Sequence, residues 1–164
     1  MSFSGERDRL SSRLGNLRLR AATIRAIRSF FEGRGYLEVE TPVMVPCPGL
    51  ELHLRPFAVA GAYLSTSPEY QMKRLLAGGL ERIFQLAHAF RDEERGDHHV
   101  REFSMLEWYR VGASLADLME ETEALFAEVA GAGLGTSHAP GIDGGAVDLT
   151  PPWVRLGVSE AFER

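Results

Sequence analysis

Two nine-residue stretches rich in apolar side chains, 83–91 and 102–110, are separated by only ten residues, most of them charged or polar. A pair of antiparallel strands is the structure that such a pattern predicts. A ten-residue hairpin loop is long, which favours a loop with a function over a plain connection. The chain is therefore expected to fold around an antiparallel hairpin whose loop contributes to a site.

The second of these strands carries a set of chemically useful side chains at two-residue steps. Phe103, Glu107 and Tyr109 are all odd-numbered, so in a regular strand they share one face. Arg91 and Glu93 share a face of the partner strand by the same count. An aromatic ring, a guanidinium and carboxylates, with histidines in the loop, suit a site for a nucleotide and a cationic small molecule.

Length and composition fit one domain with its own core. The chain has 164 residues, of which 45% are hydrophobic and 25% charged, and a net charge of −5. The acidic balance disfavours broad, nonspecific binding to nucleic acid. We expect a cytoplasmic protein for three reasons. The chain has a single cysteine, Cys47, its N-terminus is polar, and it contains no apolar run of roughly 20 residues.

Periodicity along the chain predicts an α+β fold, in which an antiparallel sheet is flanked by helices. Residues 1–15 are interpreted as a flexible lead-in, and apolar residues at steps of three or four predict a helix over 16–32. Ser67, Pro68 and Glu69 form a helix start, and Ser114 is expected to cap another helix. The other expected segments are strands at 36–41, 51–55 and 62–66, loops at 43–49 and 131–145, a helix end near residue 77, and a strand region at 146–154.

The helix at 16–32 followed by Gly-Tyr-Leu-Glu-Val-Glu-Thr-Pro at 35–42 resembles the first motif of class II aminoacyl-tRNA synthetases, subgroup of the lysine enzymes. Residues 83–110, with the core at 90–109, resemble the second motif. Thr-Ser-Pro-Glu-Tyr at 66–70, Met-Leu-Glu-Trp-Tyr-Arg at 105–110 and the short segment before the first motif are similar to the branch of ligases that attach β-lysine to elongation factor P. The resemblance covers residues 16–164 and implies a partial class II synthetase-like catalytic core.

The resemblance implies a two-step reaction. Lysine or β-lysine is activated with ATP as an aminoacyl-adenylate, and the acyl group then passes to an amine, here a lysine of elongation factor P. The helix of the first motif implies a homodimer, and tRNA is not the expected acceptor. The third motif and the Mg²⁺ ligands of the family are expected beyond residue 164, so the chain is interpreted as a fragment that does not form adenylate at a useful rate by itself.

Site residues follow from matching positions of the motifs. Arg91 is expected to bridge the α-phosphate and the substrate carboxylate, as the catalytic residue. Three further residues are expected at ATP: Glu93, His99 and Phe103, the last stacking on adenine. Glu69 is expected to take the α-amino group of the substrate, and Glu107 and Tyr109 the side-chain amine. His98 stands where a tRNA synthetase has arginine, and no metal ligand is assigned in this chain.

Each of these residues also has a plain structural interpretation. Arg91 suits a surface ion pair with an acidic neighbour, Phe103 a core position, Glu69 a favourable first-turn acid and His99 a solvated loop. Two other functions also stay open: a lysyl-tRNA synthetase, and a non-catalytic binding or dimerisation module that kept the fold. The sequence does not distinguish lysine from β-lysine, and it does not identify the acceptor.

Overall fold

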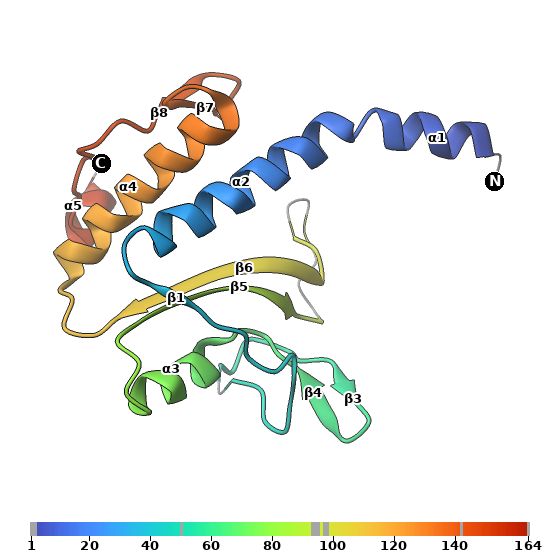
Figure 1. Ribbon diagram of the computed structural model, residues 1–164, viewed down its shortest axis with the longest axis vertical. Coiled ribbons are helices and arrows are strands. Elements are labelled where there is room, and N and C mark those ends of the chain that lie inside the picture. Colours follow the sequence, from blue (N-terminus) through green and yellow to red (C-terminus); the bar gives the residue numbers. More distant parts are fainter. Residues whose placement is uncertain (1–2, 50, 93–95, 97–98, 142, 164) are drawn as a thin grey trace. The chain divides into compact units, whose positions relative to one another are not determined.

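The computed structural model describes residues 3–49, 51–92, 96, 99–141 and 143–163. The chain forms two compact units: one is Phe31–Gly112, and the other combines Met1–Phe30 with Ala113–Arg164. Helices and sheets are both present, as Figure 1 shows, so the predicted α+β class is confirmed. No helix in the described part of the chain is long and apolar enough to cross a bilayer.

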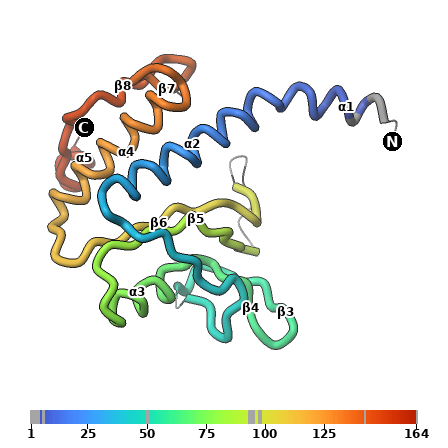
Figure 2. The backbone as a smooth tube through the Cα atoms, viewed as in Figure 1, coloured from blue at the N-terminus to red at the C-terminus, as the bar shows by residue number. Residues whose placement is uncertain are grey.

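The unit Phe31–Gly112 is built on a three-stranded sheet in the order β1-β5-β6, with strands β1 (Leu37–Glu38), β5 (Arg82–Phe90) and β6 (Glu102–Arg110). β5 and β6 pair antiparallel along their whole length, and the tube in Figure 2 shows them running side by side. β1 adds to β5 in parallel. The predicted hairpin is therefore confirmed, and the sheet around it is mixed.

One face of this sheet packs on aromatic residues. Phe84 and Trp108 are direct cross-strand partners. The ring of Phe31 stacks on Phe84 with centroids 4.8 Å apart and lies 5.5 Å from Trp108. Phe31 and Phe84 are fully buried. Because side chains alternate along a strand, Phe84 and Trp108 lie on the even-numbered face, while Glu107 and Tyr109 lie on the odd-numbered face.

A second small sheet and a helix complete this unit. The sheet has the order β2-β4-β3, with antiparallel strands β2 (Met44–Val45), β4 (Ala62–Leu64) and β3 (Ala58–Val59). Helix α3 (Glu69–Ala77) follows β4. Its first turn is fixed as the sequence predicts, since Ser67 Oγ accepts a hydrogen bond from the Glu69 N–H at 3.1 Å and Pro68 has a helical φ of −75°.

The other unit is mainly helical, with α1 (Phe3–Ser11), most of α2 (Leu14–Glu32), α4 (Leu115–Leu134) and α5 (Val158–Glu163), and a hairpin of β7 (His138–Pro140) and β8 (Ala146–Asp148). The predicted helix at 16–32 is confirmed as α2. Ser114 caps α4 as predicted, and it forms a capping box with Asp117. Trp153 packs edge-on against Phe126, with centroids 5.5 Å apart.

Several local expectations differ from the structure. The strand at 51–55 is wrong: Leu52 is 95% exposed, the Leu54 N–H bonds back to the Glu51 carbonyl, and no strand among the described residues pairs with this segment. An alternating pattern is not sufficient without a partner strand. The expected loop at 43–49 contains β2, and the expected loop at 131–145 contains the end of α4 and β7. Of the strands expected at 36–41 and 146–154, only the short strands β1 and β8 form. The lead-in at 1–15 contains α1.

Candidate functional site

The odd-numbered face of β6 carries the aromatic ring, the carboxylate and the phenol that the sequence predicts to lie together. In the register, Phe103 is opposite Ala89, Glu107 opposite Gln85, and Tyr109 opposite Ile83. The prediction that Phe103, Glu107 and Tyr109 share one face is confirmed by this pairing and by direct contact, because the Tyr109 hydroxyl donates to Glu107 Oε2 at 2.8 Å.

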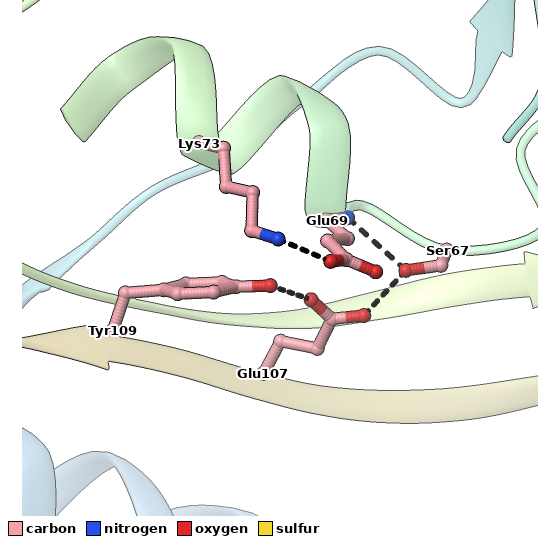
Figure 3. Close-up of polar contacts among 5 residues, drawn as sticks. All are labelled: Ser67, Glu69, Lys73, Glu107 and Tyr109. Carbon is pink, nitrogen blue, oxygen red and sulfur yellow. Dashed lines mark hydrogen bonds and ion pairs between the residues drawn. The ribbon is translucent and has the colours of Figure 1, made fainter. Parts of the chain in front are cut away.

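The Glu107 carboxylate is held by a hydroxyl at each oxygen. Tyr109 donates to Oε2, and Ser67, just before α3, donates to Oε1 at 2.5 Å (Figure 3). Ser67 also accepts from the backbone N–H of Glu69, so one hydroxyl connects the start of α3 to the middle of β6. Ser67, Glu107 and Tyr109 are all half-buried. Charge-assisted hydrogen bonds of this kind fix the orientation of a carboxylate.

Tyr109 acts as a permanent donor in this network. Burial raises the pKa of its hydroxyl, and the hydrogen bond to Glu107 raises the pKa further, because a phenolate beside a carboxylate is unfavourable. The phenol therefore stays protonated at neutral pH. Glu107 faces two neutral donors, and each carboxylate oxygen keeps a lone pair for a further donor.

Glu69 brings a second carboxylate to the same place. It is the first residue of α3, and Figure 3 shows Glu69 and Lys73 projecting from the helix toward Glu107 and Tyr109 on β6. The Lys73 ammonium lies 2.5 Å from Glu69 Oε1. The hydrogen bond and the charge of Glu69 raise the pKa of Lys73. Two acidic side chains from two different elements thus face one another across a small polar region.

Arg91 and Phe103 form the other half of the site. Arg91 directly follows β5, and its guanidinium carbon lies 5.2 Å from the centre of the Phe103 ring. Its Nε–H donates to the carbonyl of Thr66 at 3.3 Å. Thr66 precedes Ser67, so the segment before α3 contacts both Arg91 and Glu107. The predicted aromatic platform and guanidinium are thus brought together, in contact with the segment that holds the carboxylates.

The remaining predicted residues are placed less fully. Glu93 and His98 lie outside the described residues. His99 is exposed, and its backbone N–H donates to the carbonyl of Gly96 at 3.1 Å. Glu102, which carries no predicted catalytic role, pairs with His88 at 3.2 Å on the opposite, even-numbered face.

This arrangement can bind a small molecule that carries both positive and negative groups. Glu69 and Glu107 suit ammonium groups, and Tyr109 supplies a neutral hydrogen-bonding group beside them. The Arg91 guanidinium suits a carboxylate or phosphate, and the Phe103 ring suits a flat base. Among the described residues, no group of three or more His, Cys, Asp or Glu lies around a common point.

Two residues of the site lie beyond the sequence predictions. The sequence predicts Ser67 only as a helix cap, and its bond to Glu107 joins positions 40 residues apart, which no local pattern reveals. Lys73 carries no prediction. Its pairing with Glu69 has a signal in the sequence, because an acid followed by a cation four residues later on a helix is a favourable pair.

Comparison with known proteins gives consistent matches. The family of class II tRNA synthetases (D, K and N) matches residues 8–164. Proteins named elongation factor P–(R)-β-lysine ligase are similar over 129 residues: that of Yersinia enterocolitica is 47% identical, that of Erwinia tasmaniensis 48%, and that of Salmonella paratyphi B 46%. Each alignment covers 73% of this chain and 40% of the relative. The chain thus spans about 40% of the length of these curated relatives.

Proposed function

Since this chain belongs to the class II tRNA synthetase family of the D, K and N enzymes, we propose that the protein containing it is an ATP-dependent ligase for lysine or β-lysine. The proposed acceptor is a lysine of elongation factor P. The names of the similar proteins from Yersinia, Erwinia and Salmonella support this choice of amino acid and acceptor. The observation that carries the proposal is the cluster of two carboxylates beside an arginine and an aromatic ring.

Charge complementarity supports an amino acid with two amines. Lysine and β-lysine each carry two ammonium groups and one carboxylate, and the site offers two carboxylates and a guanidinium. In the proposal Glu69 takes the α-amino group of lysine or the β-amino group of β-lysine, while Glu107 and Tyr109 take the side-chain amine. An ammonium group entering a partly dry site costs several kcal/mol unless it is paired and hydrogen-bonded. A neutral side chain would leave Glu107 without that partner, so amines are favoured.

ATP is proposed to lie on the other half of the site. Phe103 is assigned to the adenine ring, a stacking contact of about 1–3 kcal/mol by analogy with bases in nucleic-acid complexes. Arg91 is assigned to the α-phosphate and the substrate carboxylate, and Glu93 and His99 to other parts of ATP. The guanidinium that now lies over Phe103 has a planar fork of donors that suits both anions.

The proposed reaction has two steps. A carboxylate oxygen of the amino acid attacks the α-phosphorus of ATP, the bond to the leaving pyrophosphate breaks, and an aminoacyl-adenylate forms. The amine of the acceptor lysine then attacks the acyl carbon and loses a proton, and AMP leaves. The protein contributes by positioning the reactants and by neutralising charge on the phosphate and carboxylate, and these two effects dominate catalysis of such reactions. No step is assigned to Mg²⁺ by the residues present here.

Two further parts of the proposal concern assembly and setting. We place a homodimer interface on α2, where Leu14 and Leu17 are 48% and 55% exposed at helical spacing, although both are apolar. Sedimentation velocity on the full-length protein tests it: a monomer at micromolar concentration would contradict this part. The proposed setting is the cytoplasm, where ATP and a translation factor are both available.

The decisive experiment uses the full-length protein and measures pyrophosphate exchange with lysine, (R)-β-lysine and other amino acids. Lysine- or β-lysine-dependent exchange, followed by transfer of the labelled amino acid to elongation factor P, is the expected result. Transfer to bulk tRNA instead would identify a lysyl-tRNA synthetase. No binding of either ATP or lysine by calorimetry would favour the non-catalytic module.

A further inference from the structure

Lys73 is the single lysine of a chain that otherwise uses arginine, with 17 arginines in all. It stands one helical turn after Glu69 on α3, and its ammonium nitrogen lies 2.5 Å from Glu69 Oε1 (Figure 3). An arginine can hold a carboxylate with two parallel hydrogen bonds, whereas an ammonium group is a compact charge on a flexible stem. A lysine at this position therefore suits a contact that is made and broken.

The Glu69–Lys73 contact belongs to the same electrostatic neighbourhood as the Glu107 network. After the hydrogen bond and charge of Glu69, the charge of Glu107 also contributes to the raised pKa of Lys73. Glu69 contributes in turn to the raised pKa of Tyr109. Lys73 thus remains an ammonium group at neutral pH, and it lies where two carboxylates face each other. A cation at this place resembles the amine of the proposed substrate.

The two sides of the Glu69–Lys73 pair differ in how easily they move. The Lys73 side chain is 54% exposed and the Glu69 side chain 34%. Exposed ion pairs at this helical spacing contribute little to stability, so releasing Lys73 into water costs little. A second ammonium group placed beside Glu69 would repel Lys73. Displacement of Lys73 therefore costs little when this carboxylate accepts another amine.

Building on the proposed function, we propose that Lys73 is a tethered counterion of Glu69 that occupies the carboxylate in the empty site and is displaced by the amine of the incoming amino acid. Lys73 is then a specificity-determining residue. An amino acid displaces it only when its other groups are bound at the same time, its second amine by Glu107 and Tyr109 and its carboxylate by Arg91. Simple amines that contact Glu69 alone do not gain enough binding free energy to displace Lys73.

The test compares three variants of the full-length protein in lysine-dependent pyrophosphate exchange. Lys73→Met removes the charge and keeps the length, and we expect it to lower KM for lysine by about 1.4- to 2.3-fold, the ratio that corresponds to an exposed ion pair of this spacing. Lys73→Arg is expected to raise KM for lysine, because the fork holds Glu69 more firmly. Arg74→Met, the matched control, removes a positive charge from the neighbouring position and leaves KM unchanged. KM for ATP stays the same in all three.

A direct measurement keeps the test independent of kinetics. In full-length protein labelled with ¹⁵N-lysine, the Lys73 side-chain signal is identified by its loss in Lys73→Met, and saturating unlabelled lysine is expected to shift it toward that of a solvated lysine. The inference is overturned if exchange is active but Lys73→Met leaves KM unchanged or raises it, if Arg74→Met has the same effect, or if the signal does not move. Absence of exchange with both lysine and β-lysine in the unmodified protein would overturn the proposed function, and this inference with it.

Discussion

Ser67 is one of the two residues that orient the Glu107 carboxylate, the other being Tyr109. The Ser67 hydroxyl donates to one carboxylate oxygen and accepts from the first amide of α3. Ser67→Ala removes a hydrogen bond to a charged group, a contact of about 1.5–3 kcal/mol. In the full-length protein we therefore expect KM for lysine to rise by at least about tenfold, with little change in KM for ATP.

The control for Ser67 must separate positioning from the loss of a helix cap. Ser114→Ala removes a capping hydroxyl from α4, which belongs to the other unit, and costs about 1 kcal/mol of unfolding free energy. Ser67→Thr keeps a hydroxyl and is expected to restore most of the affinity for lysine. Equal KM values for Ser67→Ala and Ser114→Ala would show that Ser67 is only a cap.

Tyr109 gives a prediction about pH. Because its pKa is raised, the neutral phenol contributes stability below the ordinary tyrosine pKa of about 10, and this stability is lost as the pH rises through the folded-state pKa. An ultraviolet titration of the folded protein should show the same phenolate amplitude near pH 10 for wild type and Tyr109→Phe. Glu107→Gln should move the titration of Tyr109 to lower pH. If Tyr109→Phe loses the phenolate absorbance of one tyrosine near pH 10, the raised pKa of Tyr109 is refuted.

Among the elements, the hairpin of β5 and β6 packs Phe84 and Trp108 against Phe31 on its even-numbered face and carries Glu107 and Tyr109 on the other. Phe84 is fully buried against Phe31, so Phe84→Ala is expected to cost about 3–5 kcal/mol of unfolding free energy in a urea titration. Phe162→Ala makes the same chemical change at a side chain that is 89% exposed and should cost less than about 0.5 kcal/mol. Equal costs would contradict the burial of Phe84 against Phe31. If Phe84→Ala does not fold, Phe84→Leu is used instead and is expected to lower the unfolding free energy by a smaller amount.

The elements that local patterns specify are predictable. Apolar residues spaced three or four positions apart identify α2, and apolar-rich stretches of nine residues identify β5 and β6. The Ser-Pro-Glu start identifies α3, and the cap Ser114 identifies the start of α4. Odd and even numbering along β6 then places Phe103, Glu107 and Tyr109 on one face. The strand expected at 51–55 is wrong because pairing depends on a neighbouring segment. The hydrogen bond from Ser67 to Glu107 is not predictable for the same reason, since tertiary folding alone brings α3 to β6.

At the scale of the whole molecule, the site on α3, β5 and β6 is one part of what the proposed reaction needs. Residues from α3, β6 and the end of β5 supply carboxylates, a phenol, a ring and a guanidinium. The curated relatives are about two and a half times as long as the portion that this chain matches. Arg91 is the one described residue that the proposal assigns to the α-phosphate, where charge must be stabilised during adenylate formation.

The 164-residue chain by itself is therefore expected to bind ATP weakly and to show no useful lysine-dependent pyrophosphate exchange, whereas the full-length protein does. Calorimetric titration with lysine and ATP, together with the exchange assay, measures both properties on the same samples. Arg91→Ala in the full-length protein is the matched inactive control, because it removes the proposed contact to the α-phosphate and leaves the rest of the protein present. Exchange by the 164-residue chain clearly above that of the full-length Arg91→Ala variant would mean that α3, β5 and β6 already assemble a complete catalytic site.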